Sequence, residues 1–132
     1  MNSNLEKFLE LPELSDVTGT VTLPRIGATI TVRAMSEPEF RTYQKRVQGK
    51  IKRNPMKNNY DAGAFMNMVV SNHIIDPDFS NSEFLSKTGC SDSDDFISRK
   101  LLSGEITAIY AKINEISGFH IELDEDIEEA KN

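Results

Sequence analysis

The residue types best suited to chemistry gather in the stretch SNHIIDPDFSN, residues 71–81. His73, Asp76 and Asp78 lie close together there, and imidazole and carboxylate groups are ligands that divalent metals take in hydrolytic sites. His73 and Asp76 share a helical face only if the helix continues to Asp76. Pro77 disfavours a helical Asp76, and Asp-Pro-Asp is common in turns. We interpret the stretch as a helix end and a turn, and keep a small metal hydrolase at His73 and Asp76 as an alternative.

Cys90 is the single cysteine and the other candidate for chemistry. A cysteine nucleophile needs a neighbouring base and a group that orients the base. The chain holds two histidines, His73 and His120, and neither stands in a recognisable catalytic signature. A lone cysteine after a helix-ending glycine is more typical of a packing residue. The sequence also lacks a glycine-rich phosphate loop and an EF-hand loop, so it predicts no catalytic residue, no metal site and no cofactor.

The chain is acidic, with a net charge of −6 over 132 residues, but its charges are unevenly spread. Residues 41–57 carry seven Lys or Arg and no acid, whereas residues 121–132 carry six acids and one Lys. A nucleic-acid-binding regulator would use the basic segment, but the overall acidity disfavours nucleic acid as a partner. The basic segment and the acidic tail of neighbouring copies would attract each other, which keeps a homo-oligomer open.

The sequence also bears on location. No apolar run approaches the ~18 residues that a membrane-spanning helix needs. The N-terminus lacks the basic and apolar regions of a secretory signal. A single cysteine fits a reducing cytoplasm. We therefore expect a cytoplasmic location and no membrane partner.

The first third of the chain predicts a short helix followed by a β-hairpin. In NLEKFLEL, residues 4–11, the apolar residues Leu5, Phe8 and Leu9 share one helical face. β-Branched residues then alternate with Thr and Arg on both sides of PRIG, residues 24–27. This pattern predicts a hairpin over residues 17–33.

The rest of the chain predicts helices at about 37–53, 61–75, 82–88, 92–102 and 104–117. Ser36 and Glu39 form a capping box for the first. Residues 121–132 read as a flexible acidic tail. The fold class is therefore α+β, with an N-terminal β-hairpin packed on a bundle of four or five mostly short helices. We expect residues 1–16 to be a short helix and linker, and residues 17–120 to be one compact domain.

Without assigned chemistry, the surface features are those that suit protein binding. An amphipathic helix of a partner can lie in an apolar groove, and methionine adapts to varied surfaces. The candidate contacts are an apolar set and a basic stripe: Tyr43, Val47, Ile51, Met66 and Met68, together with Arg46, Lys50 and Arg53. Each also has a plainer interpretation, as a core residue or as part of a solvated face.

Several segments together point to a known family. They are LEKFLEL, the hairpin-to-helix passage LPRIGATITVRAMSEPEF, the stretch DPDFSNSEFLSKTGCSDSDDFISRKLLSGEI and the segment INEISGF before an acidic end. KLLSGEI followed about ten residues later by ISGF is the most telling pair. In this order the chain, over residues 5–120, resembles the XkdN-like tail assembly chaperones of phages and prophages. Ser103 stands where the resemblance would lead us to expect proline.

The resemblance implies a non-enzymatic protein. Such a chaperone is expected to bind the tape measure protein in the cytoplasm of the bacterial host and to keep it soluble while tail tube subunits polymerise. It would be absent from the mature virion, and a longer form made by frameshifting is common in such proteins. The alternatives are a tail structural or connector component retained in the virion and, less favoured, the nucleic-acid-binding regulator.

Overall fold

A computed structural model of the chain describes residues 1–49 and 61–119. Strands β1 (Thr18–Leu23) and β2 (Ala28–Arg33) form the predicted antiparallel hairpin, with Thr18 opposite Arg33 and Leu23 opposite Ala28. A positive φ of 70° at Gly27 closes the turn. A third strand, β3 (Ile74–Asp76), pairs antiparallel with the free side of β2, so the sheet order is β1-β2-β3.

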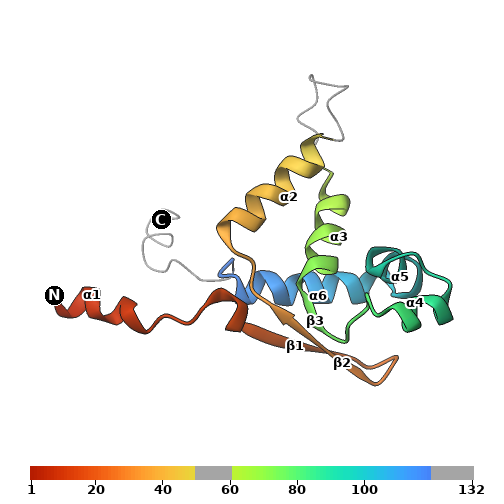
Figure 1. The fold of residues 1–132 in the computed structure, drawn as a ribbon, viewed down its shortest axis with the longest axis horizontal. Coiled ribbons are helices and arrows are strands. Elements are labelled where there is room, and N and C mark those ends of the chain that lie inside the picture. Colours follow the sequence, from red (N-terminus) through yellow and green to blue (C-terminus); the bar gives the residue numbers. More distant parts are fainter. Residues whose placement is uncertain (50–60, 120–132) are drawn as a thin grey trace, which may run out of the picture.

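The core lies between this sheet and two helices. Helix α6 (Ser103–Ile116) runs along the sheet and also contacts α3 (Ala62–His73), as Figure 1 shows. Both helices place apolar side chains at helical spacing, and β2 turns alternate residues inward. The most deeply buried apolar members of the core are Ile30, Val32, Val47, Phe65, Val69, Val70, Ile97, Ile109 and Ile113.

Gly19 allows β1 to approach α6 closely. A Cβ atom added at Gly19 would lie 3.1 Å from Ile116 Cγ2 and 3.1 Å from Lys112 Cδ. Both are side-chain atoms of α6, so a larger residue at position 19 would force these side chains or the helix to shift.

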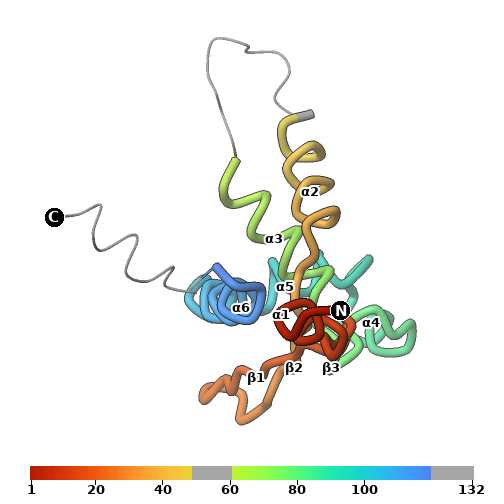
Figure 2. The backbone as a smooth tube through the Cα atoms, turned by 90° about the vertical axis from the view of Figure 1, so that its left-hand side faces the viewer, coloured from red at the N-terminus to blue at the C-terminus, as the bar shows by residue number. Residues whose placement is uncertain are grey.

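Helix α2 (Glu37–Gly49) rises from the sheet beside α3, as the two views in Figures 1 and 2 agree. The predicted capping box is present at its start. The backbone N–H of Glu39 donates to Ser36 Oγ at 3.3 Å, and the backbone N–H of Ser36 donates to Glu39 Oε1 at 3.1 Å. The helix was expected to reach residue 53, but residues 50–60 lie outside the described part of the chain.

The predicted helix over residues 61–75 is wrong at its end. Asp61 caps α3, but the helix ends at His73, and Ile74–Asp76 form β3 instead. Pro77 disfavours the helical conformation for the residue before it. The extended backbone can pair with the open side of β2, which satisfies polar groups that a frayed helix end would leave exposed.

Two short helices lie at the end of the molecule that carries the hairpin turn. They are α4 (Ser82–Thr88), capped by Asn81, and α5 (Ser93–Lys100), capped by Asp92. Gly89 ends α4 in the left-handed conformation, with φ of 71°. The expected bounds 92–102 were too wide, since α5 ends at Lys100.

The N-terminal segment stands away from this body. Helix α1 (Ser3–Glu6) continues into the 3₁₀ turn η1 (Lys7–Glu10), and a second 3₁₀ turn, η2 (Leu14–Asp16), leads into β1. Figure 1 shows α1 projecting beyond the sheet. The division into residues 1–16, a domain 17–120 and a tail 121–132 stays a prediction, and the tail lies outside the described residues.

Candidate functional site

His73 is fully buried and both of its ring nitrogens are engaged within the fold. Its Nδ1 lies 3.2 Å from the backbone oxygen of Arg33, which can only accept, so Nδ1 carries a proton. Its Nε2 accepts a hydrogen bond from the Tyr43 hydroxyl at 2.9 Å. Burial, together with the nearby Arg33 guanidinium, lowers the pKa of His73 and keeps the ring neutral.

Arg33 and Glu39 continue this polar network towards solvent. Arg33 Nη2 donates to Glu39 Oε2 at 2.9 Å, and Arg33 Nη1 donates to Glu39 Oε1 at 3.2 Å. This bidentate pair holds the pKa of Glu39 at about 2, and the backbone N–H of Ser36 adds to the lowering. Glu39 Oε2 also lies 3.8 Å from His73 Nε2, but this contact is not an ion pair while the imidazole is neutral.

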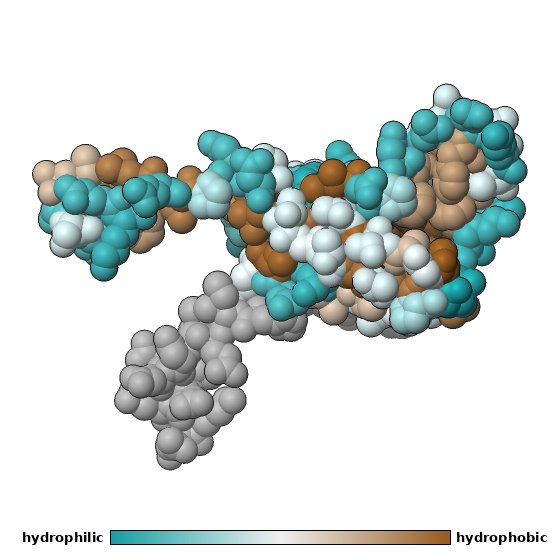
Figure 3. All heavy atoms as spheres, turned by 90° about the horizontal axis from the view of Figure 1, so that it is seen from below, coloured by the Kyte–Doolittle hydropathy of each residue, from teal (hydrophilic) through white to brown (hydrophobic). Residues whose placement is uncertain are grey.

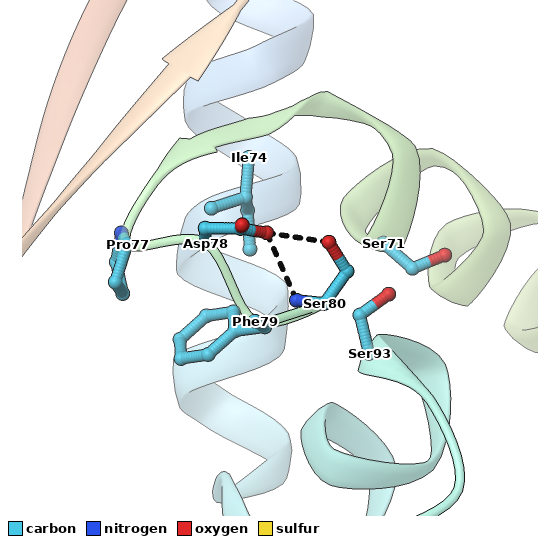
Figure 4. A pocket seen from close by; sticks show the side chains of 7 residues that line it. All are labelled: Ser71, Ile74, Pro77, Asp78, Phe79, Ser80 and Ser93. Carbon is cyan, nitrogen blue, oxygen red and sulfur yellow. Dashed lines mark hydrogen bonds between the residues drawn. The ribbon is translucent and has the colours of Figure 1, made fainter. Parts of the chain in front are cut away.

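The metal hypothesis for residues 71–81 fails on this geometry. His73 has no free nitrogen in the folded chain, and Asp76 belongs to β3. Asp78 accepts hydrogen bonds from the backbone N–H and the hydroxyl of Ser80, which lower its pKa (Figure 4). Asp78 is also the one carboxylate lining the small pocket of about 70 Å³ drawn there. No group of three potential metal-binding side chains occurs within residues 1–49 and 61–119.

Cys90 is buried beside the end of α4. Its Sγ lies 3.8 Å from the Thr88 backbone oxygen and 3.6 Å from Arg99 Nη1. Neither contact is a general base that would activate a thiol. The predicted packing role fits these surroundings better than nucleophilic catalysis.

The predicted partner contacts lie in different surroundings. Tyr43 and Val47 are buried in the core, Met66 and Met68 are half-buried against it, and Arg46 is exposed. Lys50, Ile51 and Arg53 lie outside the described residues. In the folded chain the apolar face of α2 therefore packs inward, and contact of Tyr43 or Val47 with a partner would require α2 to move. Partner binding by this set stays a prediction.

Two apolar surfaces remain open, and the sequence pointed only to the second of them. The first is a hollow of about 320 Å³ at the hairpin-turn end, between the turn, the 76–79 segment, α4 and α5. Figure 3 shows apolar atoms recessed between hydrophilic ones at this end. The walls are almost wholly apolar, and its lining residues include Leu23, Ile26, Ile30, Phe79, Phe84, Phe96 and Leu101.

Three phenylalanines give this pocket its rigid wall. The ring centroids of Phe79 and Phe96 lie 5.0 Å apart in a stacked arrangement, and those of Phe84 and Phe96 lie 4.7 Å apart edge to face. Such ring pairs add stabilisation beyond the area that they bury. The sequence offers no signal for this cluster, because the rings come from three segments that only the fold brings together.

The second open surface is the N-terminal segment. Five of its apolar side chains are between 50% and 67% exposed: Leu5, Phe8, Leu9, Leu11 and Leu14. Figure 3 shows apolar atoms on an arm that extends beside the body. The predicted helical face is present, but nothing in the described chain covers it. A row of uncovered large apolar side chains is typical of an interaction surface.

None of the helices within the described ranges has both the length and the apolarity to cross a membrane. In the comparisons with known proteins, the family model described as "Phage XkdN-like tail assembly chaperone protein, TAC" matches residues 5–131. No curated protein and no solved structure gave a significant match.

Proposed function

Because the chain belongs to the phage XkdN-like tail assembly chaperone family, we propose that it binds the tape measure protein and keeps that protein soluble during tail assembly. The observation that carries this proposal is the family match over residues 5–131. The role is non-enzymatic: the chaperone acts by reversible protein binding in the cytoplasm of the bacterial host, and it is absent from the mature virion.

The uncovered apolar side chains support a binding role. A tape measure protein is a long helical chain, and an amphipathic helix can pair its apolar face with another apolar surface. The N-terminal segment offers such a surface at no cost to the core, since none of its residues is buried. We therefore place one contact with the tape measure protein on Phe8 and Leu9.

Co-expression with the tape measure protein of the same phage tests the proposal. We expect the tape measure protein to be soluble, and to co-purify, only when this chain is present. A double variant Phe8→Ser with Leu9→Ser should fold normally but lose most of the co-purified partner. The matched control is Ile75→Ser with Leu102→Ser, which removes two apolar side chains that are 45% and 55% exposed on the body. A tape measure protein that is equally soluble without the chain would refute the proposal.

Mass spectrometry of purified tails separates the chaperone from a structural or connector component. A chaperone is displaced as the tail tube grows, so its peptides should be missing from finished tails. Stoichiometric recovery of this chain from tails would instead identify a component of the virion.

A further inference from the structure

We propose that the apolar pocket at the hairpin-turn end receives the apolar side chains of a basic amphipathic helix of the tape measure protein. This inference rests on the proposed function and adds to it the site and the chemical character of the bound segment. Three observations carry it: the construction of the pocket, the charge around it, and the mismatch with segments of this chain itself.

The pocket is built as a receptor for an apolar anchor. Its volume of about 320 Å³ lies at the lower end of the range for ligand pockets, which suits one or two large side chains. The stacked rings of Phe79 and Phe96 form a rigid wall on one side. Ile26, half exposed on the hairpin turn, forms part of the rim. Apolar pockets that take up a large side chain are where interfaces concentrate their binding energy.

The surroundings of the pocket are acidic. Residues 76–101, which include α4 and α5, hold six acids and three Lys or Arg. Three cations at this end are paired: Lys87 with Glu83 at 3.1 Å, Arg99 with Asp95 at 3.3 Å, and Arg25 with Glu105 at 2.7 Å, while Lys100 forms no ion pair within the described part of the chain.

Two carboxylates at this end remain open to a partner. Asp76 lines the pocket itself, and Asp94 lies in the first turn of α5. Both are exposed, and neither has an ion pair among the described residues. A partner helix with a large apolar side chain flanked by Lys or Arg could fill the pocket and form ion pairs with these carboxylates at the same time.

Segments of this chain fit the pocket poorly. The uncovered N-terminal segment carries Glu6, Glu10, Glu13 and Asp16 against a single Lys7, so the acidic rim would repel it from a second copy. Helix α2 carries Arg41, Lys45 and Arg46, but its apolar residues are buried in its own core. Among the described residues, neither of these two segments combines positive charge with a free apolar face, and this favours a different chain as the occupant.

Titration with synthetic helical peptides tests the chemistry directly. One peptide carries leucine on one face and lysine on the other, and its control replaces every lysine with glutamate. We expect the lysine peptide to bind the wild-type chain, measured by fluorescence anisotropy, and to weaken as salt rises. We expect the glutamate peptide to bind at least tenfold more weakly. Equal binding of the two peptides, or no binding of the lysine peptide, would overturn the proposal.

Two isoleucine variants locate the contact. Ile26→Lys removes the rim of the pocket, and Ile75→Lys adds the same charge at an exposed isoleucine that does not line it. We expect Ile26→Lys to weaken peptide binding at least tenfold, and Ile75→Lys to weaken it less than threefold. Equal losses would mean that added charge alone explains the effect and that the pocket is not the site.

Pull-down of the tape measure protein with the same variants separates the two levels of inference. If wild type and both variants retain the tape measure protein equally, the pocket is not its site but the proposed function stands. If wild type does not retain it either, the proposed function fails. If Ile26→Lys instead abolishes self-association of this chain, measured by analytical ultracentrifugation, a second copy covers the pocket and the proposal is wrong.

Discussion

The hydroxyl of Tyr43 donates a hydrogen bond across 2.9 Å to Nε2 of His73, and the pair joins α2 to the end of α3 in the buried part of the molecule. His73 in turn donates from Nδ1 to the Arg33 backbone oxygen at the end of β2. One neutral imidazole thus connects two helices and the sheet. Its hydrogen-bonding capacity is fully used, which accounts for the presence of a histidine with no exposed surface.

We predict that Tyr43→Phe destabilises the chain. The variant keeps the ring but leaves Nε2 of a buried imidazole without its donor, which typically costs about 1–3 kcal/mol in free energy of unfolding. Urea denaturation measures the change. The control is Tyr110→Phe in α6. The Tyr110 ring is half-buried, and its centroid lies 6.5 Å from that of the Phe65 ring. A loss at Tyr43 no larger than that at Tyr110 would show that the hydrogen bond contributes little.

We predict that the folded chain loses stability on mild acidification because of His73. Its pKa in the folded chain lies below the ordinary value of 6.5, so below pH 6.5 the unfolded state binds more protons than the folded state. Stability is therefore full above pH 6.5 and falls as the pH drops below it. Denaturation midpoints between pH 8 and pH 5 test this, and NMR titration of the imidazole signals reports the pKa directly. A His73 signal that titrates at or above 6.5 would contradict the prediction.

We predict a second loss of stability, at more acidic pH, that depends on Glu39. Its pKa of about 2 lies below the ordinary 4.5, so the folded state binds fewer protons and the stabilisation is full above pH 4.5. It is lost as the pH falls from 4.5 towards 2. A Glu39→Gln variant should lose most of this dependence and up to about 3 kcal/mol at neutral pH, less what solvent screening removes.

The neighbouring Glu37 is the matched control for that measurement. It pairs with Arg41 at 2.6 Å in an i,i+4 arrangement, but both side chains are about two-thirds exposed, at 68% and 64%. Exposed pairs of this kind contribute about 0–1 kcal/mol. Glu37→Gln should therefore leave the acid dependence almost unchanged, and a comparable effect at both positions would argue against a special role for the pair of Glu39 with Arg33.

We predict that Gly19→Val destabilises the chain although valine is a better strand former than glycine. The added side chain would collide with Ile116 and Lys112 of α6, and overpacking of this kind typically costs about 1–3 kcal/mol. Thermal denaturation measures the effect. Gly104→Ala in the first turn of α6 is the control, since a Cβ there meets nothing within 4 Å and should stabilise the helix. A more stable Gly19→Val variant would mean that α6 shifts to accommodate the added side chain at little cost in free energy.

Local signals in the sequence predicted the hairpin and the capping box, since both depend on neighbouring residues. The short strand β3 was missed because three residues ahead of a proline carry no periodic pattern, and only the open side of β2 makes them a strand. The predicted α+β fold class is nevertheless confirmed, since β3 only adds a strand to the predicted hairpin. The spacing of Tyr43 and Val47 identified an apolar face correctly but not what covers it, which is the core.

The apolar pocket could not be predicted for a related reason. Phe79, Phe84 and Phe96 meet only after the chain has turned between α4 and α5, and Ile26 reaches them from the distant hairpin. Periodicity describes one element at a time. Sites made by several elements become visible only in the fold.

The N-terminal segment and the apolar pocket lie at opposite ends of β1, so a partner that contacts both would be held more firmly than by either one. The segment joins the sheet beside Val17, whose backbone oxygen accepts from Ala34 N–H at 2.8 Å, whereas the apolar pocket lies at the other end of β1. The six residues of β1 separate the two by about 20 Å. A long helix that touches both ends is held bivalently, because the first contact raises the effective concentration for the second. Each contact can then be weak alone, and, under the proposed function, a growing tail tube that displaces one contact would weaken the other.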